Sequence, residues 1–424
     1  MKLDSYWLDT APAGIQVSEG PVEGHVDVAV IGGGFTGLSA ALALGKRGAS
    51  VAVLDAGRIG GGASGRNGGQ CNTGVAQDYA ALRAQLGIER AQGCYRAYAA
   101  AVDTVERLIR DEQIDCDYLA SGKLKLAAKP HHLEHLEQTG ELIQREVDPH
   151  VEIITRDGIR SEVDSDSFFG GLLQKRGGQM HMGKFAVGLA NAATRNGARL
   201  FEHATVTAIA KDRGAYRIDS SRGTLRAQQV LIATGPSRHG PFGWYRRRLA
   251  PVGSFIVVTE PLPAEHLARL LPQRRSYTTS RLMHNYFRVT PDSRLLFGGR
   301  ARFTASEQPS DAKSGRILQA NLAATFPSLA SARIDYCWGG LVDITADRLP
   351  RAGQHDGLYF SMGYSGHGTQ MSTHMGQVMA DVIGGNAAAN PWRDFDWPAI
   401  PGHTGKPWFL PLVGAYYQIK DVFY

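Results

Sequence analysis

The feature that most constrains this chain is residues 28–55, which join two short apolar runs through a glycine-rich turn and a helical stretch. The turn has GxGxxG spacing at Gly32, Gly34 and Gly37, and the second apolar run ends at Asp55. This order predicts strand, tight turn, helix and strand, with bare backbone N–H groups at the helix N-terminus facing a pyrophosphate. Asp55 is placed to accept hydrogen bonds from an adenosine ribose. We therefore expect a dinucleotide-binding unit rather than a purely structural turn.

A second glycine-rich loop follows at residues 60–70, where six of the eleven residues are glycine. Regular structure is excluded there, and the loop offers many backbone N–H groups. It also carries the hydroxyl of Ser64, the guanidinium of Arg66 and the amides of Asn67 and Gln70. These groups suit phosphate oxygens and the edge of a flat heteroaromatic ring. A flexible linker would be richer in serine and poorer in arginine and asparagine, so a ligand-binding loop is favoured.

Two further stretches have the same character. Residues 230–235 form an apolar strand that ends in Ala-Thr-Gly, which is typical of domains that bind a flavin dinucleotide. Residues 363–368, GYSGHG, lie between an expected strand at 357–362 and an expected helix at 369–383. The chain thus has glycine-rich turns near both ends that can serve one ligand.

The remaining periodicities predict a mixture of helices and strands, with a β-rich second region at 244–302. Helices are expected at residues 77–113, 130–147, 184–196, 311–326 and 413–422. Strands are expected at residues 122–128, 198–201, 205–210, 216–220, 226–233, 254–260, 285–290, 295–300 and 333–338. Residues 1–24 are expected to form an irregular arm anchored by Tyr6 and Trp7.

Composition excludes several classes of protein. The net charge is +6, but the arginines are dispersed except at residues 246–248 and no nucleic-acid-binding motif accompanies them. No apolar run approaches the roughly 20 residues that span a bilayer. The four cysteines lack metal-ligand spacing, and the histidines at 131, 132 and 135 are interpreted as exposed positions on a helix. We expect a cytoplasmic protein with reduced thiols, no metal, no transmembrane segment and no nucleic-acid partner.

The motifs together resemble the D-amino-acid-oxidase (DAO) superfamily of FAD-dependent oxidoreductases, in particular the branch that contains bacterial γ-glutamylputrescine oxidase. The resemblance rests on GGGFTGLSAAL, RIGGGASGRNGGQ, GGQMHM, RLLFGGR, DYCWGG and GYSGHG, and it runs over nearly the whole chain. It implies an α/β fold, with a Rossmann-like FAD-binding domain and an antiparallel-sheet substrate domain. The FAD-binding domain would comprise residues 25–75, 183–243 and 340–385, and the substrate domain residues 76–182 and 244–339. Residues 1–24 and 386–424 would be an arm and a tail.

The resemblance also implies which residues surround FAD. It places the pyrophosphate on the first turn, the ribose on Asp55, the flavin edge along residues 66–70 and the flavin pyrimidine at residues 363–369. The full set of expected cofactor-binding residues is Gly32, Gly34, Phe35, Thr36, Gly37, Asp55, Ala56, Arg58, Ala63, Ser64, Arg66, Asn67, Gly68, Gly69, Gln70, Val206, Ala233, Thr234, Gly235, Gly363, Tyr364, Ser365, Gly366, His367, Gly368 and Thr369.

The implied reaction is oxidation of a C–N bond by hydride transfer to flavin. The imine product is hydrolysed to an aldehyde or keto acid, and oxygen, giving H2O2, or another acceptor reoxidises the flavin. His367 and Tyr364 are the expected catalytic groups. Gln370 stands where the sarcosine-oxidase branch has a substrate-binding lysine, and Arg300 and Arg302 are expected to reach a substrate carboxylate. The cysteine that tethers flavin in that branch has no counterpart at residues 343–345, so FAD should be bound non-covalently.

Three functions stay open at this point. The first is oxidation of a γ-glutamylated polyamine such as γ-glutamylputrescine. The second is oxidation or dehydrogenation of a secondary or cyclic amino acid such as L-pipecolate. The third is a flavin-binding protein without turnover. An NAD-dependent dehydrogenase is disfavoured, because the loops at 60–70 and 363–368 would have no role in it.

Overall fold

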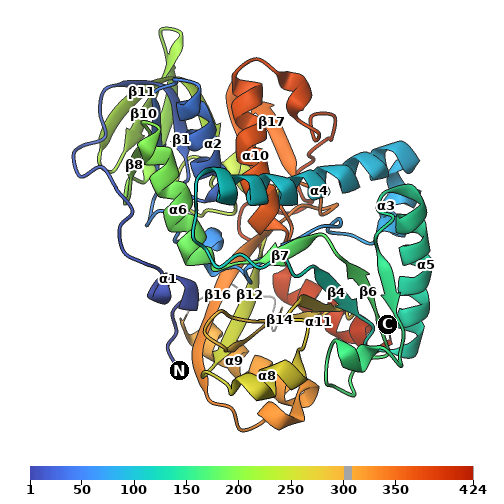
Figure 1. The fold of residues 1–424 in the computed structure, drawn as a ribbon. Helices are drawn as coiled ribbons and strands as arrows, with labels where there is room; N and C mark the ends of the chain where they lie inside the picture. Colours follow the sequence, from blue (N-terminus) through green and yellow to red (C-terminus); the bar gives the residue numbers. More distant parts are fainter. Residues whose placement is uncertain (300–307, 424) are drawn as a thin grey trace.

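The computed structural model of the protein describes residues 1–299 and 308–423, and most of the strands in this part form two large sheets (Figure 1). The first sheet occupies the upper left of the view and the second lies below it. Each has eight strands. β3 (Gln70–Asn72) and β7 (Gly177–Gln179) pair with each other as a third, two-stranded sheet. The mixed α/β fold class expected from the sequence is confirmed.

The first sheet has the order β17-β18-β11-β1-β2-β8, and β10 and β9 continue from one side of β11. Its strands are β1 (His25–Ile31), β2 (Val51–Leu54), β8 (Arg199–Phe201), β9 (Val206–Asp212), β10 (Ala215–Ser220), β11 (Gly223–Ile232), β17 (Arg351–His355) and β18 (Leu358–Met362). The run from β18 to β8 is parallel. The central strands are apolar and buried on both faces, as a parallel sheet covered by helices requires.

Three helices pack together beside this sheet. α2 (Phe35–Lys46) follows β1 and lies between α6 (Met182–Arg195) and α10 (Gly368–Ile383). α10 belongs to the C-terminal part of the chain, so the N-terminal βαβ unit is completed by a helix from the other end of the sequence (Figure 1). The glycine-rich turns before α2 and α10 therefore lie close together.

The second sheet has the order β16-β12-β15-β14-β13-β4-β6-β5. Its strands are β4 (Lys123–Leu126), β5 (Glu152–Ile154), β6 (Gly171–Gln174), β12 (Ala250–Thr259), β13 (Ser276–Thr279), β14 (Asn285–Val289), β15 (Leu295–Gly299) and β16 (Ile334–Ile344). All neighbours are antiparallel except β4 and β13, which are parallel. One face packs apolar side chains against α8 (Ala264–Leu270) and α9 (Gln308–Thr325). Because side chains alternate along a strand, the opposite face is left to line a cavity.

The remaining helices are α1 (Tyr6–Thr10), α3 (Tyr79–Leu86), α4 (Ile88–Asp111), α5 (Pro130–Glu146), α7 (Gly243–Arg246) and α11 (Leu410–Phe423), with short 3-10 turns η1 (Ala63–Arg66), η2 (Ile159–Ser161), η3 (Pro327–Leu329) and η4 (Ala387–Ala389). The helical stretch expected over residues 77–113 is confirmed, but it is divided into two helices, α3 and α4. Gly87 adopts φ 80°, which ends α3 and starts α4 in a new direction.

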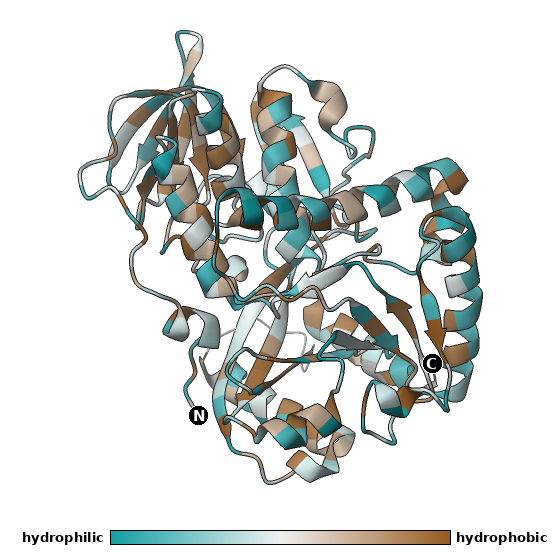
Figure 2. Cartoon of the chain, in the orientation of Figure 1, coloured by the Kyte–Doolittle hydropathy of each residue, from teal (hydrophilic) through white to brown (hydrophobic). Residues whose placement is uncertain are grey.

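Hydrophobic residues lie mainly inside the fold, and hydrophilic residues lie mainly on its surface. Figure 2 shows hydrophobic residues along the strands of both sheets and hydrophilic residues on the outward turns of α4 and α5. α4 is amphipathic: its tyrosine, valine and leucine side chains are buried on one face, and its arginine and glutamate side chains face outwards. Within the described residues, no helix is both long enough and apolar enough to cross a membrane.

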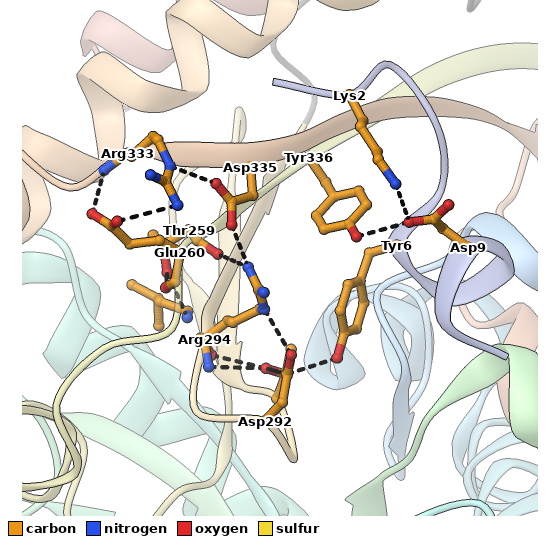
Figure 3. Close-up of polar contacts among 12 residues, drawn as sticks. Lys2, Tyr6, Asp9, Thr259, Glu260, Asp292, Arg294, Arg333, Asp335 and Tyr336 are labelled. Atoms are coloured by element: carbon orange, nitrogen blue, oxygen red, sulfur yellow. Dashed lines mark hydrogen bonds and ion pairs between the residues drawn. The ribbon is translucent and has the colours of Figure 1, made fainter.

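The N-terminal arm is anchored to the second sheet by a polar network (Figure 3). Tyr6 Oη donates to Asp292 Oδ1 at 2.7 Å, and Arg294 Nε donates to Asp292 Oδ2 at 2.6 Å. Arg294 Nη1 also donates to Asp335 Oδ2 at 2.7 Å. The arm is therefore not irregular throughout, because α1 is fixed by a buried tyrosine that bonds to the β14–β15 turn.

Candidate active site

The first glycine-rich turn has the geometry of a ligand cradle. Gly32 adopts φ 111°, and a Cβ there would lie 2.5 Å from Ala233 O. A Cβ on Gly37 would overlap Gly32 O, so both positions accept only glycine. Gly34 is the N-cap of α2, so the first turn of the helix, with Phe35 and Thr36, presents its N-terminus to the cavity. Such a terminus favours an anionic group through its N–H groups and dipole.

Asp55 follows β2 and fixes the neighbouring loops. Its Oδ2 accepts a hydrogen bond from Gly33 N and its Oδ1 accepts one from Gly57 N, both at 2.7 Å. The carboxylate lies on the cavity wall with Ala56 and Arg58, at the C-terminal end of a parallel strand. Each oxygen can accept a further hydrogen bond, so the expected contact with a ribose is compatible with this geometry.

The loop at 60–70 is fixed to two other elements, α2 and β16. Phe35 N at the start of α2 donates to Ser64 Oγ at 3.0 Å, which leaves the Ser64 hydroxyl hydrogen for a ligand. Trp338 Nε1 in β16 donates to Arg66 O at 3.0 Å, and Arg66 Nη1 donates to Gly339 O at 3.2 Å. A loop so rich in glycine is thereby held in one conformation.

The end of the loop is fixed by Asn67 and by a buried arginine. Asn67 Oδ1 accepts hydrogen bonds from Gly69 N at 2.8 Å and from Thr369 Oγ1 in α10 at 3.2 Å. Arg288 is 1% exposed and donates to Gly69 O and Met180 O at 3.1 and 3.0 Å. Burial lowers the pKa of the Arg288 guanidinium to about 9. The second sheet thus positions the last residues of the loop.

The third glycine-rich turn contacts the first. Tyr364 Oη lies 2.8 Å from Thr36 Oγ1 and 2.9 Å from Ser361 Oγ. Burial raises the pKa of Tyr364, so the hydroxyl stays protonated and acts as a hydrogen-bonding brace. His367 is the N-cap of α10, and its ring makes an edge contact with Tyr98 at 5.3 Å between centroids. His367 lies partly exposed on the cavity wall.

A buried carboxyl group that was not among the predicted site residues, Asp343, lies beside this turn. Asp343 Oδ2 accepts a hydrogen bond from Gly363 N at 2.6 Å, and Asp343 O accepts one from Ser365 N at 3.0 Å. Burial raises the pKa of Asp343 to about 6, and the bond from Gly363 opposes that rise. Asp343 therefore fixes the backbone of the turn before α10.

All these elements surround one cavity of about 1450 Å³, which extends from the first glycine turn to the open face of the second sheet. Most expected cofactor-binding residues line it, including Val206, Ala233, Gly235, Gly366 and Gly368. Gly37, Gly69 and Gly363 lie behind the wall and shape the turns, and Gln370 lies on it. Arg300 and Arg302 lie outside the described residues.

Two side-chain carbonyl oxygens on the wall stand out because they are buried without a partner among the described residues. They are Asn72 Oδ1 at the end of β3 and Gln370 Oε1 in the first turn of α10. The two residues touch, since Gln370 Nε2 donates to Asn72 O at 2.5 Å. A buried acceptor left unsatisfied costs about 1–3 kcal/mol, so a ligand that donates hydrogen bonds is expected here.

Other polar residues on the wall were also missed by sequence reasoning. Ser254, Thr278 and Tyr286 line it from the second sheet, and Lys123 and Lys125 line it from β4. A signal was present for the lysines, because the alternation of lysine and leucine at residues 123–126 places both lysines on one face of the strand. Within residues 1–299 and 308–423, no cluster of three or more His, Cys, Asp or Glu side chains is arranged to hold a metal.

The residues present fit FAD. The glycine cradle admits a pyrophosphate at the N-terminus of α2, and Asp55 supplies ribose acceptors beside it. Thr234 Oγ1, at the end of β11, is buried without a partner among the described residues and faces the same cavity. The N-terminus of α10 lies on the wall as a second site for negative charge. The fold and these features define a flavin-dinucleotide oxidoreductase.

Comparison with known proteins agrees. Residues 27–382 match the family described as DAO, FAD dependent oxidoreductase, and the chain belongs to this family of FAD-dependent enzymes. Gamma-glutamylputrescine oxidoreductase of Escherichia coli (strain K12) is 34% identical over 406 residues, which cover 93% of this chain and 92% of that protein. Glycine oxidase of Bacillus licheniformis is 28% identical and covers 86% of this chain and 95% of its own.

Solved structures support the fold. Glycine oxidase from Geobacillus kaustophilus aligns with a TM-score of 0.69 at 24% identity, over 85% of this chain and 95% of its own. L-proline dehydrogenase from P. horikoshii aligns with a TM-score of 0.68 at 20% identity, over 86% and 94%. The expected family and cofactor are thus confirmed.

Proposed function

We propose that this enzyme oxidises the C–N bond of an amine that carries a γ-glutamyl or similar acyl group, of which γ-glutamylputrescine is the type. The observation that carries the proposal is the pair of buried acceptors, Asn72 Oδ1 and Gln370 Oε1, on the wall of the cavity. An amine is a hydrogen-bond donor that satisfies both. Kinship with the E. coli gamma-glutamylputrescine oxidoreductase supports the acyl amine as substrate.

One part of the chain binds the cofactor, and another part binds the substrate. Residues 25–75, 183–243 and 340–385 form the FAD-binding domain, and residues 76–182 and 244–339 form the substrate-binding domain. FAD, when bound, supplies the two-electron acceptor for the C–H bond next to nitrogen. It would be held non-covalently, by the turns around Gly32 and Gly366, by Asp55 and by the loop at 60–70. The N-terminus of α10, which lines the cavity, would stabilise negative charge on the cofactor.

On the substrate side, Asn72 and Gln370 accept hydrogen bonds from the amine and orient the carbon that loses hydrogen. His367, at the N-cap of α10, takes up the proton that the ammonium form must lose before oxidation. Tyr364 is a positioning residue, because its hydroxyl holds the turn against Thr36. The contact of Arg300 and Arg302 with a substrate carboxylate stays a prediction. Oxygen or another acceptor completes turnover.

The test is product analysis. Holoenzyme incubated in air with γ-glutamylputrescine is expected to release ammonium and the corresponding aldehyde in equal amounts, with H2O2 if oxygen is the acceptor. The aldehyde is trapped with a hydrazine and identified by mass spectrometry. Products from L-pipecolate or L-proline, and none from the acyl amine, would replace the proposal with an amino-acid oxidase or dehydrogenase. No product from any amine would favour a flavin-binding protein without turnover.

A further inference from the structure

β4, a strand of the second sheet, brings two positive charges to the wall of the cavity. Lys123 and Lys125 are alternate residues of β4, so both point from the same face, and both line the cavity. Leu124 and Leu126 point from the other face into the apolar core against α8 and α9. The strand therefore cannot turn the lysines away from the cavity without exposing two core leucines.

Neither lysine has an anionic partner among the described residues. Each ammonium lies more than 4.0 Å from every carboxylate oxygen in that part of the chain. Asp78 acts on Lys125 only at longer range. Its Oδ1 caps α3 by accepting from Ala81 N at 3.1 Å, and its Oδ2 lies 3.0 Å from His135 Nε2.

The strands beside β4 add no negative charge. Lys123 and Lys125 pair with Ser276 and Thr278 of β13 on one side, and with Gln174 and Leu172 of β6 on the other. Burial lowers the pKa of both lysines, to about 8 for Lys123, and the charge of Lys125 contributes to the shift of Lys123. Two neighbouring cations that form no ion pair with the described carboxylates favour an anion between them.

A row of amides connects this charge with the acceptor pair. Gln370 donates to Asn72 O, and Asn72 Nδ2 donates to Gln70 Oε1 at 3.2 Å. Gln70 Nε2 reaches Tyr277 O in β13 at 3.5 Å, and β13 is the neighbour of β4. The acceptors at α10 and the lysines of β4 are thus two ends of one polar wall.

We propose that Lys123 and Lys125 form the site for a substrate carboxylate, so that the enzyme selects amines whose oxidised C–N bond lies several bonds away from a carboxylate. This inference rests on the proposed function and narrows it. The acceptor pair Asn72 and Gln370 holds the amine, and the lysine pair holds the acid end of the same molecule. A γ-glutamyl amine has this form, whereas a cyclic α-amino acid has its nitrogen and carboxylate on the same carbon.

Binding without turnover gives the first arm of the test. Glutarate and the uncharged glutaramide are titrated into holoenzyme, and the perturbation of the flavin absorbance gives the dissociation constants. The wild type is expected to prefer glutarate. The double variant Lys123→Met/Lys125→Met should weaken glutarate binding about 10- to 100-fold and leave glutaramide unchanged, because two charge-assisted contacts are lost. Lys125→Arg keeps the charge and should bind glutarate within a few-fold of the wild type.

The matched control is Lys175→Met. Lys175 follows β6 at the surface and forms an ion pair with Glu152, so its loss should change neither constant. FAD content and melting temperature report whether each variant is folded. A double variant that does not fold is replaced by the two single Gln variants, each expected to lose part of the preference.

Kinetics give the second arm, with γ-glutamylputrescine, N-glutarylputrescine, which keeps the carboxylate without the α-amino group, and N-butanoylputrescine, which lacks both groups. The double variant should raise KM for the first two about 10-fold or more and leave KM for the third unchanged. Glutarate binding that is equal in the wild type and the double variant, absent from the wild type, or lost instead in Arg300→Met would overturn the inference. Lysine-dependent glutarate binding in an enzyme that oxidises no amine would retain the anion site and reject only the proposed function.

Discussion

Tyr364 Oη lies 2.8 Å from Thr36 Oγ1, a contact between residues 328 apart in the sequence that joins the turn before α10 to the first turn of α2. Both turns line the cavity, so this buried contact holds the two glycine-rich turns of its wall close together. The chain therefore forms the complete site only when its C-terminal part has packed on the N-terminal βαβ unit.

Tyr364→Phe should lower the free energy of unfolding by about 1–3 kcal/mol, because the hydroxyls of Thr36 and Ser361 lose a buried partner. Chemical denaturation of the apoprotein measures this loss. Tyr359→Phe in β18, where the side chain is only partly buried, should change stability by less than about 0.5 kcal/mol. Equal effects of the two substitutions would show that the contact between the turns contributes nothing.

Asp55→Ala should raise the dissociation constant for FAD about 10- to 100-fold, since the ribose acceptor and two hydrogen bonds to the adjoining loops are removed together. Reconstitution of apoprotein, followed by quenching of flavin fluorescence, measures the constant. Asp27→Ala is the matched control. Asp27 lies in β1 and accepts a hydrogen bond from Ser50 N, but it does not line the cavity. An unchanged constant in Asp55→Ala would remove the aspartate from the cofactor site.

Gln370→Met keeps the length of the side chain but removes the acceptor that faces the cavity. We expect kcat/KM for the amine to fall about 10- to 100-fold, with FAD content unchanged. Gln377→Met on the same helix is the control, because Gln377 donates to Ser39 O away from the cavity. Steady-state kinetics decide, and an unaltered kcat/KM would mean that Gln370 does not contact the amine.

The affinity for a carboxylate-bearing substrate should depend on pH through Lys123. Burial and the charge of Lys125 lower the pKa of Lys123 to about 8, whereas Asp78 acts on Lys125 in the opposite direction. The cation is present below pH 8 and is lost as the pH rises, so KM should increase above pH 8, by at most about 10-fold per pH unit. The ratio of KM values for N-glutarylputrescine, which has the carboxylate but no α-amino group, and N-butanoylputrescine removes the titration of their common amine. A ratio that stays constant from pH 7 to 9 would contradict this assignment.

Local patterns in the sequence predicted the cofactor half of the fold well. The apolar runs at β1 and β2 and the turn between them depend on neighbours in sequence, so periodicity and glycine spacing were enough to place Gly32, Asp55 and α2. The loop at 60–70 was predicted to be a ligand loop from its composition, and the structure places it on the wall of the cavity.

The substrate half depended on contacts that no local pattern records. β13, a short polar strand of the second sheet, pairs with β14 on one side and with β4 on the other, and it was not predicted from the sequence. The strand containing Lys123 and Lys125 was predicted, but its position beside β13, across the cavity from α10, results from pairing between distant segments. For this reason the two lysines and Asn72 were missed, although their residue types suit a substrate that is both acid and amine.

The most direct test of the central claim is anaerobic reduction of the holoenzyme, monitored by the loss of flavin absorbance near 450 nm. The panel contains γ-glutamylputrescine, N-butanoylputrescine, L-pipecolate, L-proline and glycine at equal concentrations. The account predicts fast and complete bleaching by γ-glutamylputrescine, weaker saturation by N-butanoylputrescine and no rapid bleaching by the three amino acids. Bleaching by L-pipecolate or L-proline with none by the two acylated putrescines would contradict it.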